Sequence, residues 1–125
     1  MRLLLDTHVF LWAIAGAPQL KARDRKVILD AEVVYVSAAS IWEIAIKARL
    51  GKLDADPVAV AAAIESSGFV ELPVRAAHAA KVSDLPMIHN DLFDRLLVAQ
   101  AITEPLRLLT RDPVLAGYGD LVQVL

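Results

Sequence analysis

Four acidic residues are the side chains in this sequence best suited to chemistry: Asp6, Glu43, Asp94 and Asp112. Carboxylates collected in one place repel one another and raise each other's pKa values unless a cation lies among them. Mg²⁺ and Mn²⁺ favour oxygen ligands, with waters and a substrate phosphate completing the coordination. Such a metal lowers the pKa of a bound water and makes it a nucleophile. If the four acids meet, they predict a metal-dependent phosphodiesterase.

Two of these acids also have a purely structural interpretation near the start of a helix. Asp6 can cap the helix that follows it, because Asp is a favoured N-cap residue. Glu43 completes a capping-box pattern with Ser40. It also stands four residues before Lys47, the favourable orientation for an ion pair. These alternatives stay open at the level of sequence.

The other two acids differ in how well a structural role explains them. Asp112 precedes Pro113, which is an ordinary way to open a helix. Asp94 shares a helical stripe with Leu97, Val98 and Ala101, so it is expected to face inward. An unpaired buried charge is costly, and the adjacent Arg95 would not face it on a helix. Asp94 therefore favours the metal-site interpretation.

The elements that must position these acids alternate along the chain. Short apolar segments predict strands at 3–5, 33–36, 69–72, 106–109 and 121–124. Helical patterns predict helices at 9–15, 21–31, 41–50, 57–66, 75–82 and 91–102. Strands that alternate with helices and are apolar on both faces favour a parallel sheet covered on two sides. We expect one α/β domain over residues 1–125.

An open parallel sheet binds ligands beyond the carboxyl ends of its strands, where the strand order reverses. Asp6 and Asp112 each come just after a predicted strand, and Glu43 lies in the first turns of the helix after the second strand. The topology therefore predicts that acids far apart in sequence meet at one edge of the sheet.

Composition narrows the function classes. The chain has 125 residues, 57% of them hydrophobic, and a mean hydropathy of +0.51. No uncharged apolar run reaches the ~18 residues that suggest a membrane span. Asp6 and His8 interrupt the apolar N-terminal stretch, so we expect no signal peptide and a cytoplasmic protein. The surplus of apolar residues then predicts oligomerisation.

Charge and cysteine content exclude further classes. The chain has no cysteine, which removes disulfide frameworks, zinc–thiolate sites and thiol nucleophiles. Its 13 basic and 15 acidic residues give a net charge of −2, which argues against a protein that coats nucleic acid nonspecifically. A nuclease remains compatible with this charge, because bound divalent ions invert the local field.

Four segments that carry the acids resemble one known family. They are LLLDTHVFLW at 3–12, SAASIWEIAIKARLGKL at 37–53, FDRLLVAQA at 93–101 and LLTRD at 108–112. In this order they are similar to the VapC-type toxins of the PIN-domain family. The resemblance implies a three-layer PIN-like sandwich, with a central, mainly parallel five-stranded sheet flanked by helices. It also implies an Mg²⁺-dependent endoribonuclease (Mn²⁺ as substitute) that inhibits translation by cutting RNA, often transfer RNA.

The resemblance carries over partners and residue roles. It implies a homodimer that a small VapB-like antitoxin inhibits, in a heterotetramer or larger assembly. Asp6 and Asp94 are expected as the main metal ligands, with Asp112 completing the site and Glu43 orienting the attacking water or holding a second metal. Thr7 and Thr110 are expected to hold waters or to orient the carboxylates. Leu92 stands where relatives often have proline, so Asp91 is not expected to be a ligand.

The remaining functional candidates are basic, aromatic or histidine residues. RNA phosphates are the expected partners of Lys47, Arg49, Lys52, Arg95 and Arg111, the alternative being a solvated helix face. The core or a dimer interface is the expected place of Phe10, Trp12, Trp42 and Phe93. No catalytic role is expected for His8, His78 or His89, which lack ligand spacing, although His8 is close enough to Asp6 to line the site.

Other functions fit the sequence less well. A haloacid-type phosphatase needs a second Asp two residues after the first, where this chain has His8. A response-regulator receiver needs paired acids near its first strand. A catalytically silent binding module would not require four intact acids. Within the nuclease interpretation, the alternative is a PIN nuclease that acts in RNA processing or on DNA.

Overall fold

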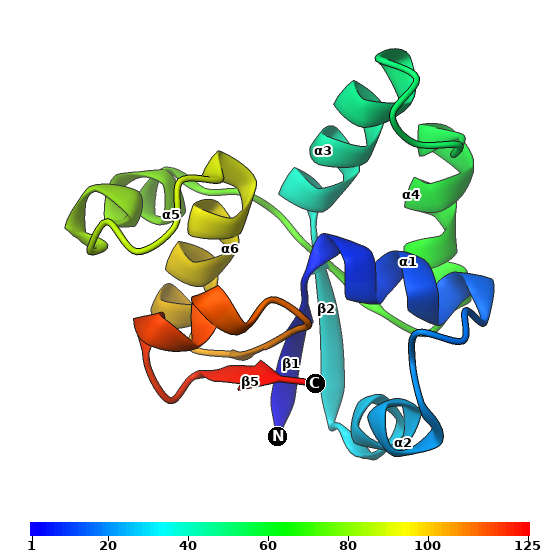
Figure 1. The fold of residues 1–125 in the computed structure, drawn as a ribbon, viewed down its shortest axis with the longest axis horizontal. Helices are drawn as coiled ribbons and strands as arrows, with labels where there is room; N and C mark the ends of the chain where they lie inside the picture. Colours follow the sequence, from blue (N-terminus) through cyan, green and yellow to red (C-terminus); the bar gives the residue numbers. More distant parts are fainter.

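The structure, a computed structural model, describes residues 1–125 and is built on one five-stranded sheet (Figure 1). The strand order is β3-β2-β1-β4-β5, and every neighbouring pair is parallel. The predicted α/β class and five strands are confirmed. The strands are β1 (Arg2–Leu5), β2 (Val33–Ser37), β3 (Val70–Leu72), β4 (Arg107–Thr110) and β5 (Val122–Val124).

All the predicted helices are present, with small differences at their ends. They are α1 (Thr7–Ala15), α2 (Ala22–Asp30), α3 (Ala38–Arg49), α4 (Pro57–Ser66), α5 (Ala76–Lys81) and α6 (Leu92–Thr103). Two 3₁₀ helices, η1 (Val82–Asp84) and η2 (Pro113–Tyr118), complete the structure. None of these helices combines the length and the apolar character needed to cross a membrane.

The start of α3 differs from the prediction. Its N-cap is Ser37, whose hydroxyl accepts a hydrogen bond from the Ala39 backbone at 3.0 Å. Ser40 therefore lies inside the helix, and the predicted capping box of Ser40 with Glu43 is wrong. The cap lies three residues earlier than predicted because β2 runs directly into α3. The hydroxyl at the end of the strand is therefore the first one able to bond the free N–H groups of the helix.

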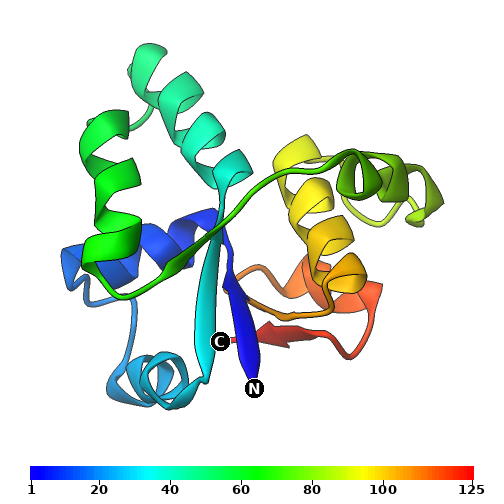
Figure 2. The same cartoon turned by 180° about the vertical axis from the view of Figure 1, so that it is seen from behind.

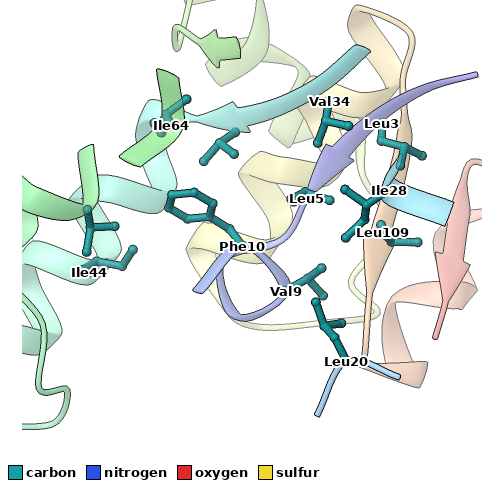
Figure 3. Close-up of a cluster of buried hydrophobic side chains, with 12 residues drawn as sticks. Leu3, Leu5, Val9, Phe10, Leu20, Ile28, Val34, Ile44, Ile64 and Leu109 are labelled. Atoms are coloured by element: carbon teal, nitrogen blue, oxygen red, sulfur yellow. The ribbon is translucent and has the colours of Figure 1, made fainter. Parts of the chain in front are cut away.

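Helices cover both faces of the sheet, which confirms the three-layer sandwich. Side chains alternate along a strand, so Leu3 and Leu5 of β1 face one way and Leu4 the other. One face packs against α1 to α4 through residues such as Phe10 and Ile64 (Figure 3). The other packs against α6 through Leu97 and its neighbours. Figures 1 and 2 show α1, α2 and α4 on one side of the sheet and α5 and α6 on the other.

The order of the strands places a reversal beside β1. The chain moves outward from β1 to β2 and β3, then returns to add β4 on the opposite edge of β1. The strand order reverses between β1 and β4, which is where open parallel sheets bind ligands. Figure 2 shows α1 and α3 starting from the same end of the sheet. The segments that follow β1, β2 and β4 thus gather at one edge.

Candidate metal centre

Asp6 is held where β1 ends and α1 begins. Its backbone N–H donates to the Leu109 carbonyl at 3.0 Å, which ties it to β4. Its Oδ1 accepts from the Val9 backbone at 2.9 Å, and its Oδ2 accepts from the Thr110 hydroxyl. Asp6 thus caps α1, as its structural interpretation predicted. Burial raises the pKa of the Asp6 carboxyl, and the bonds from Thr110 and Val9 partly offset that rise.

Thr110, the last residue of β4, joins two of the acids. Its hydroxyl donates to Asp6 and accepts from the Asp112 backbone N–H at 3.0 Å. Asp112 uses Oδ1 to cap η2, accepting from the Val114 backbone at 3.0 Å. Its Oδ2 turns toward His89, 3.2 Å from the ring nitrogen Nε2. Thr110 thus contacts both the Asp6 carboxylate and the Asp112 backbone, and the orienting role expected for it stays a prediction.

Asp94 lies in the first turn of α6, behind the N-cap Asp91. Its neighbours Leu97 and Val98 are buried, whereas Asp94 itself is half-buried at the edge of the apolar face. Burial, together with the negative charges of Asp91 and Asp6, raises the pKa of Asp94 to about 7. Asp94 is therefore a carboxylate whose charge lacks sufficient compensation in the absence of a cation.

Glu43 is buried behind the other acids, with 3% of its surface exposed. Its Oε2 accepts from the Lys47 ammonium at 2.6 Å, which confirms the predicted ion pair and raises the pKa of Lys47. Its Oε1 accepts from the Thr7 hydroxyl at 2.7 Å. The charge of Glu43 raises the pKa values of Asp6 and Asp94. Glu43 thus belongs to the same electrostatic cluster.

A surface pocket of about 350 Å³ opens onto three of the four predicted acids. The residues that line it are Asp6, His8, Trp12, Asp94, Arg111 and Asp112. Glu43 is absent from this lining. Its charge acts on Asp6 and Asp94, and its carboxylate contacts Thr7, the residue that follows Asp6 in the chain. The expectation that His8 lines the site agrees with the structure.

Three donor atoms in this region are arranged as a metal requires. The Nε2 of His89 and one carboxylate oxygen each of Asp94 and Asp112 all lie within 4.8 Å of one another. Oxygen and imidazole donors suit divalent cations, and a cation would relieve the repulsion that raises the pKa of Asp94. The residues present therefore fit a divalent metal ion.

His89 is a site residue that sequence reasoning missed. No catalytic role was expected for it, yet its Nε2 lies 3.0 Å from Asp94 and 3.2 Å from Asp112. It belongs to an irregular loop, so no helical or strand spacing marked it; its place shortly before the Phe93–Asp94 pair was the one available signal. His78, in contrast, is buried in hydrogen bonds to Glu104 and to the Arg75 backbone, away from the lining of the pocket.

The basic residues lie in four different environments. Arg95 was expected to contact RNA, and this is wrong: it is only 7% exposed, and its guanidinium donates to the carbonyls of Val82 and Pro86. Arg111 lines the pocket, with its guanidinium carbon 5.5 Å from the centre of the Trp12 ring. Lys47 is paired with Glu43, while exposed side chains are found at Arg49 and Lys52.

The aromatic residues are only partly where they were expected. Phe10 is fully buried in the core, as predicted. Trp12 packs against that core and also lines the pocket. Trp42 is 61% exposed on α3, with its ring edge-to-face on Phe93 at 5.3 Å between centroids. Trp42 is therefore not a core residue, and its other expected place, an interface, stays a prediction.

The fold and the acidic pocket agree with the sequence comparison. The sequence profile of the PIN domain matches residues 3–121, so the chain belongs to the PIN domain family. This confirms the family that the acidic motifs resemble. A search of curated proteins found no significant match.

Solved structures share the fold at low sequence identity. VapBC2 from Rickettsia felis bound to a promoter DNA fragment aligns with a TM-score of 0.72 and 16% identity, over 99% of this chain and 98% of that chain. A toxin–antitoxin complex from Klebsiella pneumoniae gives 0.69 and 16%, over 97% and 95%. DNA-bound VapBC from Salmonella typhimurium gives 0.69 and 14%, over 100% and 97%. At such identities the likeness establishes a common fold.

Proposed function

We propose that this chain is a metal-dependent endoribonuclease, the toxin of a VapBC-type toxin–antitoxin pair, in which residues 1–125 form a single PIN domain. The observation that carries the proposal is the convergence of Asp6, Asp94 and Asp112 on one pocket at the carboxyl edge of the sheet. The rise of the Asp94 pKa to about 7 in the absence of a cation supports it.

The chain's own residues prepare the site for phosphodiester hydrolysis. Asp6 and Asp94 would hold Mg²⁺, or Mn²⁺ as its substitute, with Asp112 completing the site. When bound, the ion supplies a water of lowered pKa and a Lewis acid for the phosphate. Thr110 keeps Asp6 and Asp112 oriented through its two hydrogen bonds. Such fixed orientation lowers the reorganisation needed in the transition state.

Glu43 has two proposed roles, orienting the attacking water or holding a second metal. Both of its oxygens have partners, Lys47 on one and Thr7 on the other. Either role therefore requires one of these contacts to be exchanged when substrate and metal bind. Until then, the hydrogen bond from Thr7 would fix the plane of the Glu43 carboxylate, which is the orienting role expected for Thr7.

RNA phosphates are the proposed partners of the basic side chains at the pocket and near the end of α3. Arg111 stands at the rim of the pocket beside Asp112, so it would contact the phosphate next to the cleaved bond. Arg49 and Lys52 are exposed near the end of α3, and Lys47 joins them if its pair with Glu43 opens. A chain of net charge −2 needs such local cations to approach RNA.

The proposal includes partners. The fold neighbours include VapBC assemblies and a toxin–antitoxin complex, which supports a small antitoxin as partner of this chain. An acidic pocket favours an antitoxin that presents Arg or Lys to it. Three exposed apolar side chains, Trp42 and Ile46 on α3 and Leu50 at its C-cap, lie at i, i+4 and i+8 and form one stripe suited to a homodimer contact. We further propose a cytoplasmic heterotetramer or larger complex.

The test is cleavage of total cellular RNA by the purified protein with Mg²⁺ or Mn²⁺, against EDTA. Discrete cuts, including cuts in transfer RNA, should disappear with EDTA and in an Asp6→Asn, Asp94→Asn double variant. The exposed Glu65 provides a matched control, because Glu65→Gln also removes a negative charge but lies away from the pocket. A folded, metal-loaded, antitoxin-free protein that cuts no RNA would contradict the proposal, and one that cuts DNA instead would reassign the substrate.

A further inference from the structure

We propose that His89 is a metal ligand of this centre, together with Asp94 and Asp112, so that the centre prefers Mn²⁺ and similar transition ions to Mg²⁺. This inference rests on the proposed function, because it concerns the ion that the nuclease would use. It adds a nitrogen donor to a site that the sequence predicted to be made of oxygen alone.

The spacing of the donor atoms is that of ligands around one ion. In octahedral coordination with bonds of about 2.1 Å, neighbouring ligands lie about 3 Å apart. The Nε2 of His89 lies 3.0 Å from Asp94 Oδ2 and 3.2 Å from Asp112 Oδ2. Both separations match neighbouring positions on such an ion. The ring and the two carboxylates would therefore bind it with little rearrangement.

The loop that carries His89 is fastened to the same elements that carry the acids. The backbone N–H of His89 donates to the Tyr118 hydroxyl, at the end of η2, at 3.0 Å. Arg95 of α6 donates to the Pro86 carbonyl at 3.1 Å and to Tyr118 at 3.3 Å. Because Arg95 is buried, these bonds are partly shielded from water. The loop thus holds His89 beside Asp94 and Asp112.

The orientation of the ring leaves the correct nitrogen facing the acids. Nδ1 of His89 lies 3.1 Å from the Asn90 backbone N–H, which donates to it, and Nε2 points at the carboxylates. Ligation uses the lone pair of Nε2, so the single proton of the neutral ring then sits on Nδ1. The exposed contact with Asn90 is exchanged for a hydrogen bond from Nδ1 to water, and the ring neither gains nor loses a proton.

A nitrogen donor changes which ions the centre prefers. Mg²⁺ is a hard ion that favours oxygen, whereas imidazole suits transition ions such as Fe²⁺, Ni²⁺ and Zn²⁺; Mn²⁺, at the start of that series, still accepts a nitrogen donor more readily than Mg²⁺ does. Removing the imidazole should therefore weaken Mn²⁺ binding far more than Mg²⁺ binding. We expect His89→Asn to lower the Mn²⁺ affinity by about tenfold or more and to lower the ratio of Mn²⁺ to Mg²⁺ affinity.

The experiment is pulsed electron paramagnetic resonance of Mn²⁺ bound to the full chain, read for the coupling of a directly bound nitrogen. Wild-type protein should show this coupling, and growth on ¹⁵N-histidine should change it. His89→Asn should abolish it. His8→Asn is the matched control, because His8 lines the same pocket without contacting the two acids, and it should keep the coupling. Calorimetric titrations with Mn²⁺ and Mg²⁺ give the affinity ratio for each variant.

The outcomes separate this inference from the proposed function. Mn²⁺ that binds without a nitrogen coupling, or a coupling that survives in His89→Asn, would overturn the ligand role while leaving the nuclease proposal to the RNA cleavage assay. Failure of the wild type to bind Mn²⁺ at millimolar concentration would overturn both. The ¹⁵N-histidine experiment needs no substitution, so it decides the matter even if the variant does not fold.

Discussion

At the residue scale, two acids use one carboxylate oxygen to cap a helix and direct the other toward the proposed metal site. Asp6 and Asp112 each use Oδ1 to cap a helix, which fixes the side-chain rotamer. Their Oδ2 atoms then point to defined partners, Thr110 and His89 respectively. The capping interpretation and the metal-site interpretation of these residues are therefore compatible. A cap that fixes the rotamer also pre-orients the remaining oxygen for a ligand.

The first prediction concerns Asp94 and pH. Its pKa is about 7 in the folded chain against a usual value of 3.8. The folded state therefore binds a proton that the unfolded state releases, so this contribution to stability is present below pH 3.8 and is lost as pH rises through 7. In EDTA, the melting temperature of the wild type should fall relative to that of Asp94→Asn as pH rises from about 5 to 8.

Adding Mg²⁺ should reverse this loss, most strongly at the high end of the pH range, because the ion binds the charged carboxylate. Differential scanning calorimetry of both proteins, with and without Mg²⁺, provides the measurement. Parallel pH curves for the wild type and Asp94→Asn would contradict the raised pKa.

The second prediction concerns Thr110. Replacing it by Val keeps the shape but removes the hydroxyl that joins Asp6 to the Asp112 backbone. We expect metal affinity and RNA cleavage to fall by about 10- to 100-fold, the usual effect of losing a group that orients ligands. Thr110→Ser keeps the hydroxyl and should retain most of both. Equal cleavage by Thr110→Val and the wild type would remove Thr110 from the site.

At the scale of elements, the site is assembled from segment ends. Parallel strands deliver Asp6 and Thr110 to one edge, and the strand-to-helix junction at Ser37 sets where α3 begins and so which face of it Glu43 occupies. Helix α6 contributes differently, because its Asp94 faces the pocket while its Arg95 holds the preceding loop. Adjacent residues of α6 thus have different tasks. Asp94 is a proposed metal ligand, and Arg95 holds the loop that carries His89.

The third prediction tests Arg95 as an anchor of that loop. Arg95→Met leaves several carbonyls without donors, among them those of Val82 and Pro86. The free energy of unfolding should fall by about 2–4 kcal/mol, since each buried unsatisfied group costs about 1–3 kcal/mol. Urea denaturation measures this. The exposed Arg49→Met should change it by less than about 0.5 kcal/mol. Unchanged stability with weaker RNA binding would instead restore the original expectation for Arg95.

At the scale of the whole molecule, both faces of the sheet are covered, yet apolar surface remains exposed. The stripe of Trp42, Ile46 and Leu50 runs along α3 to its C-cap, and the other face of α3 packs into the core through Ile44. This exposed stripe accounts for part of the high hydropathy of the chain. It is the structural basis of the proposed homodimer.

The fourth prediction tests that dimer. Ile46→Glu with Leu50→Glu places two charges in the stripe, and burying them in an interface is unfavourable. The wild type should sediment as a dimer and the double variant as a monomer of unchanged helical content. Leu29→Glu on α2 is the control, because Leu29 is apolar and even more exposed but lies outside the stripe. A wild type that is monomeric at micromolar concentration would contradict the proposal.

The sequence by itself determined the kinds and order of the elements and the acids that follow the strands. Alternating strands and helices, the Pro57 helix start and the Asp–Pro pair at 112–113 were readable because period and capping depend on residues close in the chain. Strands apolar on both faces predicted a parallel sheet, and such a sheet predicted that Asp6 and Asp112 would meet at its carboxyl edge. Asp94 was expected to face inward from its helix. All three line one pocket.

Only the tertiary structure decided which residues share the pocket in detail. His89 contacts Asp94 and Asp112 of that pocket, Arg95 turns into the protein, and Glu43 is bonded to Thr7 and Lys47. Each of these positions depends on contacts between segments far apart in the chain and on the path of an irregular loop. No local periodicity encodes such contacts, because they arise when separate helices and strands pack together.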